Sequence, residues 1–535
     1  MIYYGMITKS KKSLCVIHFQ QSWFTLGSAL EGIMLNAETY RSIEFTTLID
    51  GLILYPPKMH HLVNIWGLNK YKPENLVRDF LTEKLKNHGN SFFHYSRPFL
   101  PIKRLHKYKI NIDDLTSNTT LKPLKYKKMA IGMAVFSHLV TISKSNNPNT
   151  IIYKNEVRAA FETCFQIIDY LDQYAKSFDE FWIWNGRTLH ERVVVEWCKS
   201  NNKIIKFLEV ESSISDDQDR WSLLSKSPHS RLGFQTLIAN YWAESRASNS
   251  ELTQWYMNRR DKKNNKFISR QVSGRSFLSN VNYFVLFTSS DDEVTAISNE
   301  WESKWLNQIN AVENLCQIFE KNSIVTGNSK LIIRVHPNVM NKSLSTKLIW
   351  LKFTLQVKKK YSNSFVILPK ESFDSYKLMD RAIGIFVYGS TMGLEATFQG
   401  KYLSSLAPLR YGELCKIKYL QDEKSLLTWI KNVLRDNELY PSKEGSLAWA
   451  NWALNYGNKW RYVNKSNGKF LIDIYRMTSL KPNFLIIFIT RCKLLLSQKL
   501  FLRKWDLYRH LFFNLRNILE YVIYSLANHL LKFFY

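Results

Sequence analysis

Two short apolar runs that stop abruptly at polar residues constrain the fold of this chain most strongly. The first, residues 331–335, is followed by His336 and Pro337; the second, residues 383–388, is followed by Gly-Ser-Thr at 389–391. Such runs are typical of strands that are buried on both faces, as in parallel sheets covered by helices. They predict an α/β fold in which polar residues gather beyond the carboxyl ends of parallel strands.

The end of the first run places an imidazole at a strand tip. Pro337 has no backbone N–H and fixes its own φ, so the strand must stop and His336 remains at its end. A histidine there can donate a hydrogen bond or a proton to a phosphate oxygen. Taken alone, a His-Pro pair after a strand is more often a structural turn. We predict a functional role because the second run ends similarly.

The end of the second run has the pattern of an anion site. Gly389 opens a turn, and Ser390 and Thr391 precede a helix predicted over 392–398. Free N–H groups at the start of a helix, together with the two hydroxyls, can hold a phosphate. Glu395 follows Thr391 by one helical turn on the same face, so we expect it to hold a ribose or sugar hydroxyl. The alternative is a simple helix N-cap.

Two strand ends in the first half of the chain carry polar residues as well. One predicted strand ends in Asn-Gly-Arg at 185–187, where glycine permits close backbone approach and Arg187 offers a planar guanidinium to a phosphate or carboxylate. An ordinary turn with a surface arginine fits equally well. The strand predicted over 203–210 leads to Glu209 and Glu211, and either carboxylate could deprotonate a hydroxyl group or be an ordinary surface residue.

A further strand, predicted over 281–287, is followed by Ser289 and Ser290. Ser290 and Glu293 have the spacing of a capping box, which explains these residues without a ligand. The same residues can also present free backbone N–H groups to an anion. Together with Arg334, they complete the set of residues that we expect around a bound phosphate.

The alternation of strands and helices predicts two Rossmann-like domains that face a cleft, followed by a helical tail. We place the first domain at 1–250, with an irregular insertion at about 56–125, and a polar linker at 251–280. The second domain covers 281–435, and a helical C-terminal region covers 436–535.

The charge of the chain indicates what kind of partner it binds, and its cysteines indicate whether it holds disulfides or zinc. The chain has 74 Lys and Arg against 45 Asp and Glu, a net charge of +29, which favours an anionic partner such as a nucleotide, an anionic glycan, a phospholipid surface or nucleic acid. Its six cysteines are widely spaced, so we expect reduced thiols and no zinc site. No Asp-x-Asp pair stands at a predicted strand end. We therefore expect neither a metal ion nor a cofactor.

The last part of the chain, from residue 481 to residue 535, mixes leucines and aromatics with lysines and arginines. Helical apolar spacing interrupted by cations is typical of a helix that lies in a membrane interface. A helical hairpin packed on the protein is the alternative. No run of about 18 apolar residues and no cleavable leader is recognisable, so we expect a peripheral protein on the cytoplasmic face of the inner membrane.

These motifs together resemble those of the bacterial surface and capsule polysaccharide biosynthesis proteins, which are GT-B glycosyltransferase-like enzymes. The chain is similar, more distantly, to bacterial sialyltransferases and polysialyltransferases, which carry a His-Pro and a Ser-Ser or Ser-Thr motif in this order. The resemblance covers about residues 150–420 and is carried by 284–293, Glu300-Trp301, Gln308, 334–338, Pro369, 374–380, 388–396 and Gly400-Lys401.

The resemblance implies a metal-independent glycosyltransferase that moves a sugar from a nucleotide-sugar donor to a growing surface glycan or lipid-linked glycan. In those relatives the residue matching His336 contacts the donor phosphate or acts as an acid, and the hydroxyls matching Ser390 and Thr391 grip the phosphate. The acidic motif that supplies their base has no clear match, so Glu209 and Glu211 stay candidates.

Two other functions remain open. A teichoic-acid-type glycerol- or ribitol-phosphate transferase carries similar motifs. A non-catalytic basic protein that binds a membrane or nucleic acid would not need ordered strand-end motifs, and we therefore expect no nucleic-acid partner.

Overall fold

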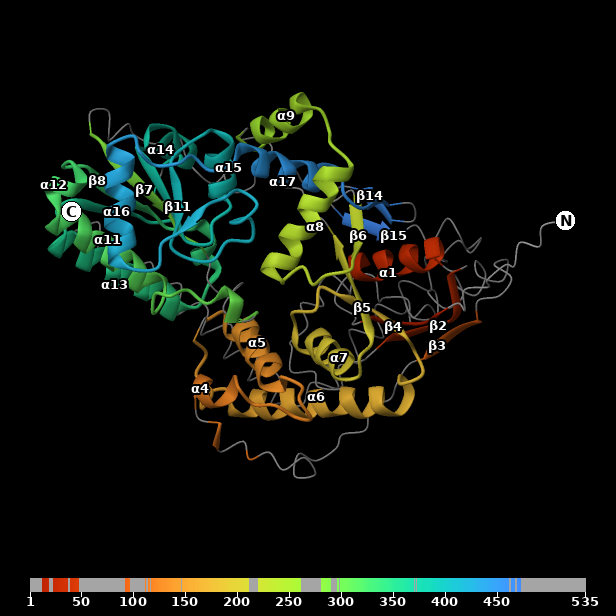
Figure 1. Ribbon diagram of the computed structural model, residues 1–535. Helices are drawn as coiled ribbons and strands as arrows, with labels where there is room; N and C mark the ends of the chain where they lie inside the picture. The colour runs from red at the N-terminus through yellow and green to blue at the C-terminus, as the bar shows by residue number, and fades with distance from the viewer. Residues whose placement is uncertain are drawn as a thin grey trace, which may run out of the picture.

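The chain forms two α/β units, each built on its own sheet, in the computed structural model (Figure 1). The structure describes residues 12–18, 23–36, 39–47, 92–96, 111, 114–115, 117–145, 147–210, 220–260, 281–289, 296–297, 299–369, 371, 373–460, 463–466 and 469–472.

The first sheet has the strand order β13-β6-β5-β4-β1-β2-β3. Its strands are β1 (Lys12–His18), β2 (Tyr40–Thr47), β3 (Phe92–Ser96), β4 (Glu180–Trp184), β5 (Ile204–Val210), β6 (Arg220–Leu224) and β13 (Asn458–Lys459). The run from β3 to β5 is parallel, whereas β6 and β13 are antiparallel to their neighbours. Residues 14–17 of β1 are all buried, as expected for a strand covered on both faces.

Helices cover both faces of this sheet. One face packs against α1 (Trp23–Asn36), and the other against α5 (Ile131–Ser143), α6 (Lys154–Tyr174) and α7 (Leu189–Ser200). Short α4 (Asn118–Leu121) precedes α5, and α8 (Arg231–Glu244) and α9 (Asn249–Arg260) follow β6.

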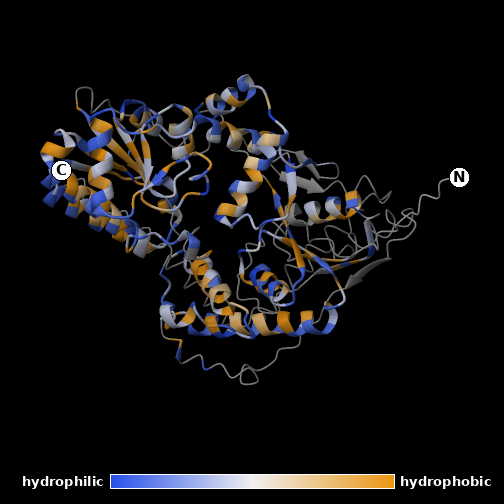
Figure 2. Cartoon of the chain, in the orientation of Figure 1, coloured by the Kyte–Doolittle hydropathy of each residue, from blue (hydrophilic) through white to orange (hydrophobic). Residues whose placement is uncertain are grey.

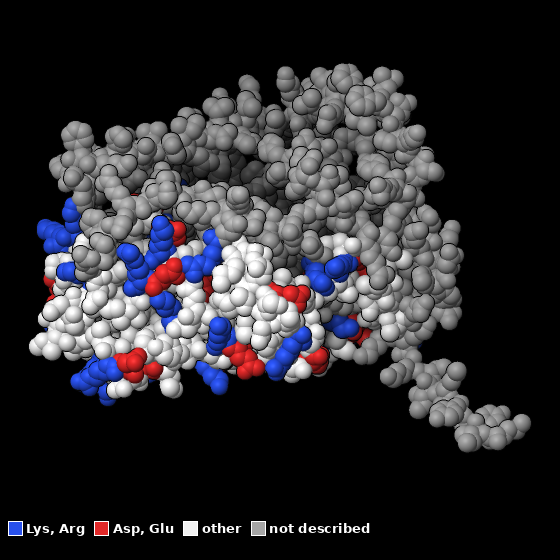
Figure 3. Space-filling view, turned by 90° about the horizontal axis from the view of Figure 1, so that it is seen from above, with Lys and Arg blue, Asp and Glu red and all other residues white. Residues whose placement is uncertain are grey.

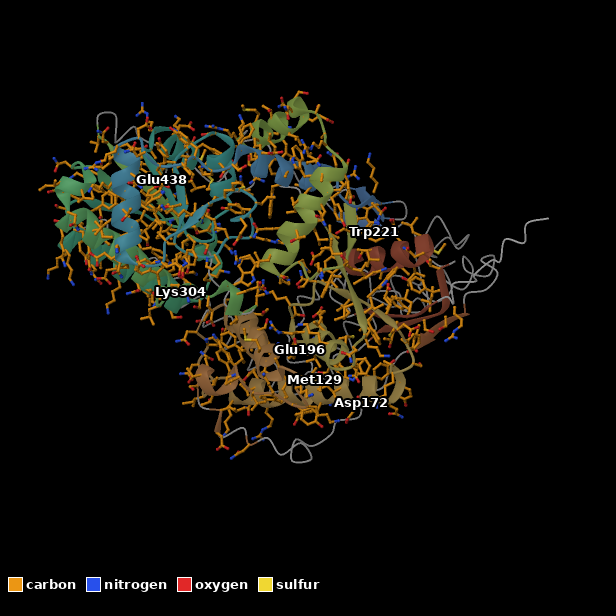
Figure 4. The ribbon with its side chains drawn as sticks, in the orientation of Figure 1. Met129, Asp172, Glu196, Trp221, Lys304 and Glu438 are labelled. Carbon is orange, nitrogen blue, oxygen red and sulfur yellow. The ribbon has the colours of Figure 1, made fainter. Side chains whose placement is uncertain are left out.

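Polar contacts fasten the helical layer on the outer face of the first unit. Glu196 on α7 accepts a hydrogen bond from the N–H of Ala130, next to Met129, at 3.1 Å. Asp172 on α6 accepts one from Trp197 Nε1 at 3.0 Å. Figure 4 shows Met129, Glu196 and Asp172 in this layer, with Trp221 of β6 on the other side of the unit. The layer therefore holds together through side-chain bonds as well as apolar packing.

The second sheet is entirely parallel and has the order β12-β11-β10-β7-β8-β9. Its strands are β7 (Tyr283–Phe287), β8 (Lys330–Arg334), β9 (Ser364–Ile367), β10 (Gly384–Val387), β11 (Leu403–Ser405) and β12 (Lys418–Tyr419). Figure 2 shows the apolar strands of both sheets inside helices with polar outer surfaces. This is the pattern that the apolar runs in the sequence predict.

One face of the second sheet packs on α11 (Gln308–Lys321), α13 (Leu344–Lys360) and α16 (Glu423–Leu434). The other face packs on α14 (Ser375–Arg381), α15 (Met392–Phe398) and α9. Shorter elements are η4 (Asn299–Trp301), α12 (Ser323–Thr326) and η5 (Pro337–Asn341). Seen from above, the described surface mixes Lys and Arg with Asp and Glu, so positive charge is not gathered into one field on this face (Figure 3).

The chain returns to the first unit through α17 (Lys443–Asn455), which packs against α8 and α9 before β13 pairs with β6. Asn451 is buried in this contact. Its Nδ2 donates to the carbonyl of Ser245 at 2.6 Å, and its Oδ1 accepts the N–H of Ala247 at 3.0 Å. Helix α17, the last helix of the described residues, is therefore part of both units.

The predicted fold class of two α/β units, each with helices on both faces of a largely parallel sheet, is confirmed, but three predicted segments need correction. Residues 251–260, placed in a linker, belong to α9, because Leu252 and Tyr256 are buried in the core of the second unit. The irregular insertion contains the paired strand β3 and helix α4. The C-terminal region adds the hairpin of β14 (Val463–Ser466) and β15 (Lys469–Ile472) to α17.

The predicted tail at 481–535 lies outside the described residues. Among the residues that are described, no helix has the combined length and apolar character needed to cross a bilayer.

Asn451→Ala should lower the free energy of unfolding by about 1–3 kcal/mol, because the carbonyl of Ser245 and the N–H of Ala247 lose their partner in the buried amide. Gln254→Ala, at an exposed position of α9, is the matched control and should change stability little. Denaturant unfolding of both variants measures the difference. Equal stability of the two would show that the α17 contact does not depend on this amide.

Candidate active site

The ends of three strands of the second sheet meet at one edge. Strands β10, β7 and β8 are parallel neighbours, so the residues that follow them share the carboxyl edge of the sheet. The N–H of His336, after β8, donates to Thr288 Oγ1, after β7, at 2.9 Å. Gly389, after β10, lies against Ser289, since a Cβ added to this glycine would come within 3.1 Å of Ser289 Oγ. The structure thus brings together three of the residues predicted from the sequence.

The hydrogen bonding of His336 fixes which ring nitrogen carries the hydrogen. The residue caps η5, and its Nδ1 accepts the N–H of Asn338 at 3.1 Å. In a neutral ring with Nδ1 as the acceptor, the hydrogen is on Nε2. His336 therefore presents a donor on the side of the ring opposite the turn.

The two hydroxyls after β10 have different environments. Ser390 is buried; its Oγ accepts the N–H of Met392 at 3.3 Å, and its carbonyl accepts the hydroxyl of Tyr411. Thr391 is exposed, and its side chain makes no capping hydrogen bond to α15. Gly389 has a φ of +71°, which favours glycine at the start of this turn. Ser390 holds the loop, and Thr391 presents its hydroxyl on the surface.

Two other residues that were predicted to bind the nucleotide-sugar donor are buried within the protein. Glu395 on α15 is 2% exposed, and its Oε1 accepts a hydrogen bond from Arg259 Nε at 2.5 Å. Burial raises the pKa of Glu395, and the Arg259 guanidinium opposes this. Arg334 is also buried, with Nη1 donating to the carbonyl of Leu368 at 2.7 Å, and burial lowers its pKa to about 10. These placements speak against the predicted contact of Glu395 with a sugar and put Arg334 beside the end of β9.

The first unit has its own polar cluster at the ends of β4 and β5. Asn185 has a φ of +52°, and the next residue, Gly186, has a φ of +80°. Asn185 Nδ2 donates to Glu209 Oε1 at 2.5 Å, and its Oδ1 lies 2.7 Å from His229 Nε2. Because an amide oxygen only accepts, Nε2 of His229 carries the hydrogen. A chain of hydrogen bonds from His229 through Asn185 thus holds the carboxylate of Glu209.

Three arginines surround His229. Burial, followed by the charges of Arg410, Arg187 and Arg192, lowers the pKa of His229 to about 3. The ring is therefore neutral at physiological pH. Sequence reasoning singled out Arg187 but missed His229, Arg192 and Arg410, which no spacing or motif connects to the strand ends.

The loop that carries His229 is held by the second unit. The carbonyl of His229 accepts a hydrogen bond from Trp301 Nε1 at 2.8 Å, and that of Pro228 accepts one from Arg410 Nη2 at 2.9 Å. From the first unit, Arg192 Nη1 donates to the carbonyl of Ala296 at 2.9 Å. The polar cluster of the first unit therefore lies at a contact between the two units.

Of the predicted site residues, Glu211 and Ser290 lie outside the described residues. In the part of the chain that is described, no three His, Cys, Asp or Glu side chains group as metal ligands would.

Comparison with known proteins gives no match to a family model and none to a curated protein. Among solved structures, the chain is similar to the beta Kdo 2,4 transferase of Thermosulfurimonas dismutans KpsC (14% identity, 56% of this chain and 87% of that one, TM-score 0.34). It is also similar to the beta Kdo 2,7 transferase of the same KpsC (12%, 61% and 89%, 0.32). A putative UDP-N-acetylglucosamine 2-epimerase from Listeria monocytogenes is a further neighbour (12%, 87% and 94%, 0.25). Similarity at this level does not establish a shared activity.

The neutral, buried state of His229 predicts a specific dependence of stability on pH. Its pKa is about 3 in the folded chain and near 6.5 when unfolded, so the unfolded state binds more protons between these values. Stability is thus lost as pH falls below about 6.5, by about 2 kcal/mol between pH 7 and pH 5. His229→Gln should remove this part of the slope. Unfolding curves at the two pH values check it, and identical slopes in parent and variant would contradict it.

Proposed function

We propose that the protein is a glycosyltransferase that moves a sugar from a nucleotide-sugar donor to a growing surface glycan, such as a capsule or an O-antigen. The observation that carries this proposal is the meeting of His336, Ser289 and the turn at 389–391 at one edge of the second sheet. Open α/β sheets bind their ligands at this edge. The polar cluster of Asn185, Glu209 and His229 in the first unit supports an acceptor side opposite this donor side.

On the donor side, His336 Nε2 and the hydroxyl of Thr391 are the groups proposed to contact the phosphate. Both are donors, and donors directed at a leaving phosphate stabilise the charge that develops as the sugar bond breaks. Ser390 has a different role in the proposal, because its side chain and its carbonyl are engaged within the protein. Its task is to hold the turn in place.

On the acceptor side, Glu209 is the general base of the proposal. Asn185 holds one carboxylate oxygen at the end of β5, which fixes the direction of the group. A carboxylate in such a place can take the proton of an attacking hydroxyl. Glu211, two residues further on, remains the other candidate. The arginines around His229 add positive charge, which favours an anionic group on a sugar or phosphate.

We also propose that the tail at 481–535 brings the enzyme to the cytoplasmic face of the inner membrane, where a lipid-linked acceptor lies. The support is the mixture of cations with leucines and aromatics in its sequence. Co-sedimentation with anionic vesicles, at low and at high salt, of the full chain and of a chain that ends at residue 480 tests this proposal, because only the full chain carries the tail. A full chain that stays in the supernatant at low salt would exclude it.

The first experiment on the proposed enzyme identifies the nucleotide of its sugar donor. Thermal unfolding with CMP, UDP and GDP identifies the nucleotide, since a ligand that binds only the folded state raises its melting temperature. Labelled sugars on that nucleotide then show transfer. Transfer of glycerol phosphate or ribitol phosphate instead would establish the teichoic-acid-type reaction, and no stabilisation by any nucleotide would leave a non-catalytic binder.

Replacing His336 should separate its two hydrogen-bonding roles. In His336→Asn, the side-chain oxygen still accepts the N–H of Asn338, so the turn is kept, but the Nε2 donor is lost. We expect kcat to fall on the order of 10²- to 10⁴-fold with an unchanged melting temperature. Turnover close to that of the parent, in a folded variant, would remove His336 from the reaction.

Thr391 and Ser390 should respond differently to the same change. Thr391→Ala should weaken nucleotide binding by roughly 1–3 kcal/mol without altering stability, because one exposed hydroxyl is lost. Ser390→Ala should lower the free energy of unfolding by about 1 kcal/mol, because a buried cap is lost. Calorimetry with the identified nucleotide and denaturant unfolding separate the effects. Unchanged affinity in Thr391→Ala would exclude its contact with phosphate.

A further inference from the structure

The outer face of α13 is uncovered by the rest of the described chain. Its inner face is buried in the second unit through Trp350 and Val357. On the outer face, Leu348 is 37% exposed, Ile349 53% and Leu355 49%. Single exposed apolar side chains are normal on a protein surface, but a cluster of large ones within two turns marks a surface that contacts a partner.

All charged side chains of α13 are positive. Its sequence, LSTKLIWLKFTLQVKKK, contains five lysines and no acidic residue. Leu348, Lys352, Leu355 and Lys359 follow one another at steps of four, three and four residues, which places aliphatic and cationic side chains along one stripe.

Two acidic side chains of neighbouring α11 bond to the last turn of α13 and to the residues that follow it. Glu313 accepts hydrogen bonds from Gln356 and from Tyr361, the latter at 3.3 Å. Glu320 accepts from Ser362 at 3.0 Å. Neither carboxylate belongs to the exposed stripe, so the positive charge of the stripe is not neutralised by its own helix or by these two acids.

A second exposed apolar pair lies on the adjoining loop of the first unit. The N–H of Ser343, at the start of α13, donates to the carbonyl of Lys144 at 3.3 Å. The loop that continues from Lys144 carries Ile151 and Ile152, which are 64% and 70% exposed, with Lys154 just beyond. The loop that begins beside the start of α13 therefore also carries exposed aliphatic side chains and a lysine.

We propose that the outer face of α13 binds the surface of an anionic phospholipid bilayer. Aliphatic side chains interleaved with lysines match the boundary between acyl chains and acidic headgroups. A soluble anionic ligand would use the lysines but leave the aliphatic side chains in water. Binding at this helix needs neither catalysis nor the tail, so it can be tested apart from the proposed transferase activity.

The position of the helix relative to a bilayer can be measured directly in the full chain. An environment-sensitive dye on Ile349→Cys or on Leu355→Cys should shift to shorter wavelength with vesicles of phosphatidylglycerol and phosphatidylcholine. The same dye on Lys424→Cys, an exposed position of α16, should not shift. The parent chain, labelled in parallel, supplies the background. No shift at the two α13 positions would overturn the proposal, as would an equal shift at Lys424→Cys.

Charge variants supply the second test. Replacing Lys352 and Lys359, the two cations of the stripe, by glutamine should lower partition into anionic vesicles on the order of tenfold or more. The matched control replaces the exposed Lys424 and Lys431 of α16 by glutamine and should change partition little.

Equal losses in the two charge sets would mean that only total charge matters and would overturn the proposal. A dye shift that depends on protein concentration and needs no vesicles would identify the face as a contact between copies of the chain. Neither set should alter transfer to a soluble acceptor, so failure here and failure of the transferase proposal give different results.

Discussion

The contacts of residues 409–414 are the constraint on which both halves of the candidate site depend. The hydroxyl of Tyr411 donates to the carbonyl of Ser390, in the turn proposed to bind phosphate. Its neighbour Arg410 donates to the carbonyl of Pro228, beside His229 in the other unit. Gln235 of the first unit bonds to Glu413 at 2.8 Å and to the N–H of Leu414 at 2.8 Å. One short segment thus sets the position of the donor turn and of the acceptor-side loop at once.

A buried ion pair holds the same turn from its other end. Glu395, on the helix that follows the turn, meets Arg259 of α9, and the Arg259 guanidinium lies over the ring of Trp255. Removing one partner of such a pair leaves an uncompensated buried charge, which typically costs 3–5 kcal/mol. Gly393 also has to be glycine, because a Cβ there would overlap the Tyr411 hydroxyl. The exposed Thr391 therefore stands on a backbone that is fixed on both sides.

The sequence predicted strands β4, β5, β7, β8 and β10, and the edge at which the residues after β7, β8 and β10 lie, because these apolar runs end abruptly at polar residues. It even placed α15 at its observed bounds. Strands β6, β9, β11 and β12 were not predicted. The sequence did not predict that Glu395 is buried in an ion pair. Helical periodicity shows on which face of a helix a residue lies, but it does not show that Arg259, 136 residues away in the sequence, packs against that face. The sequence did not identify His229, Arg192 and Arg410 as residues of the candidate site for the same reason. Strand β3 was missed because its five residues, Phe-Phe-His-Tyr-Ser, lack the pattern of a buried strand.

The return of α17 to the first unit has a mechanical consequence. The chain passes from the first unit to the second at α8 and α9 and comes back at α17, and these helices pack against one another (Figure 1). The chain thus connects the two units twice, at helices that pack side by side. This arrangement resists sliding of one unit along the other but allows rotation about the axis of the packed helices. A rotation of one unit against the other would therefore have to take place about this helix bundle, and it would have to break the hydrogen bonds of residues 410–414 to the first unit.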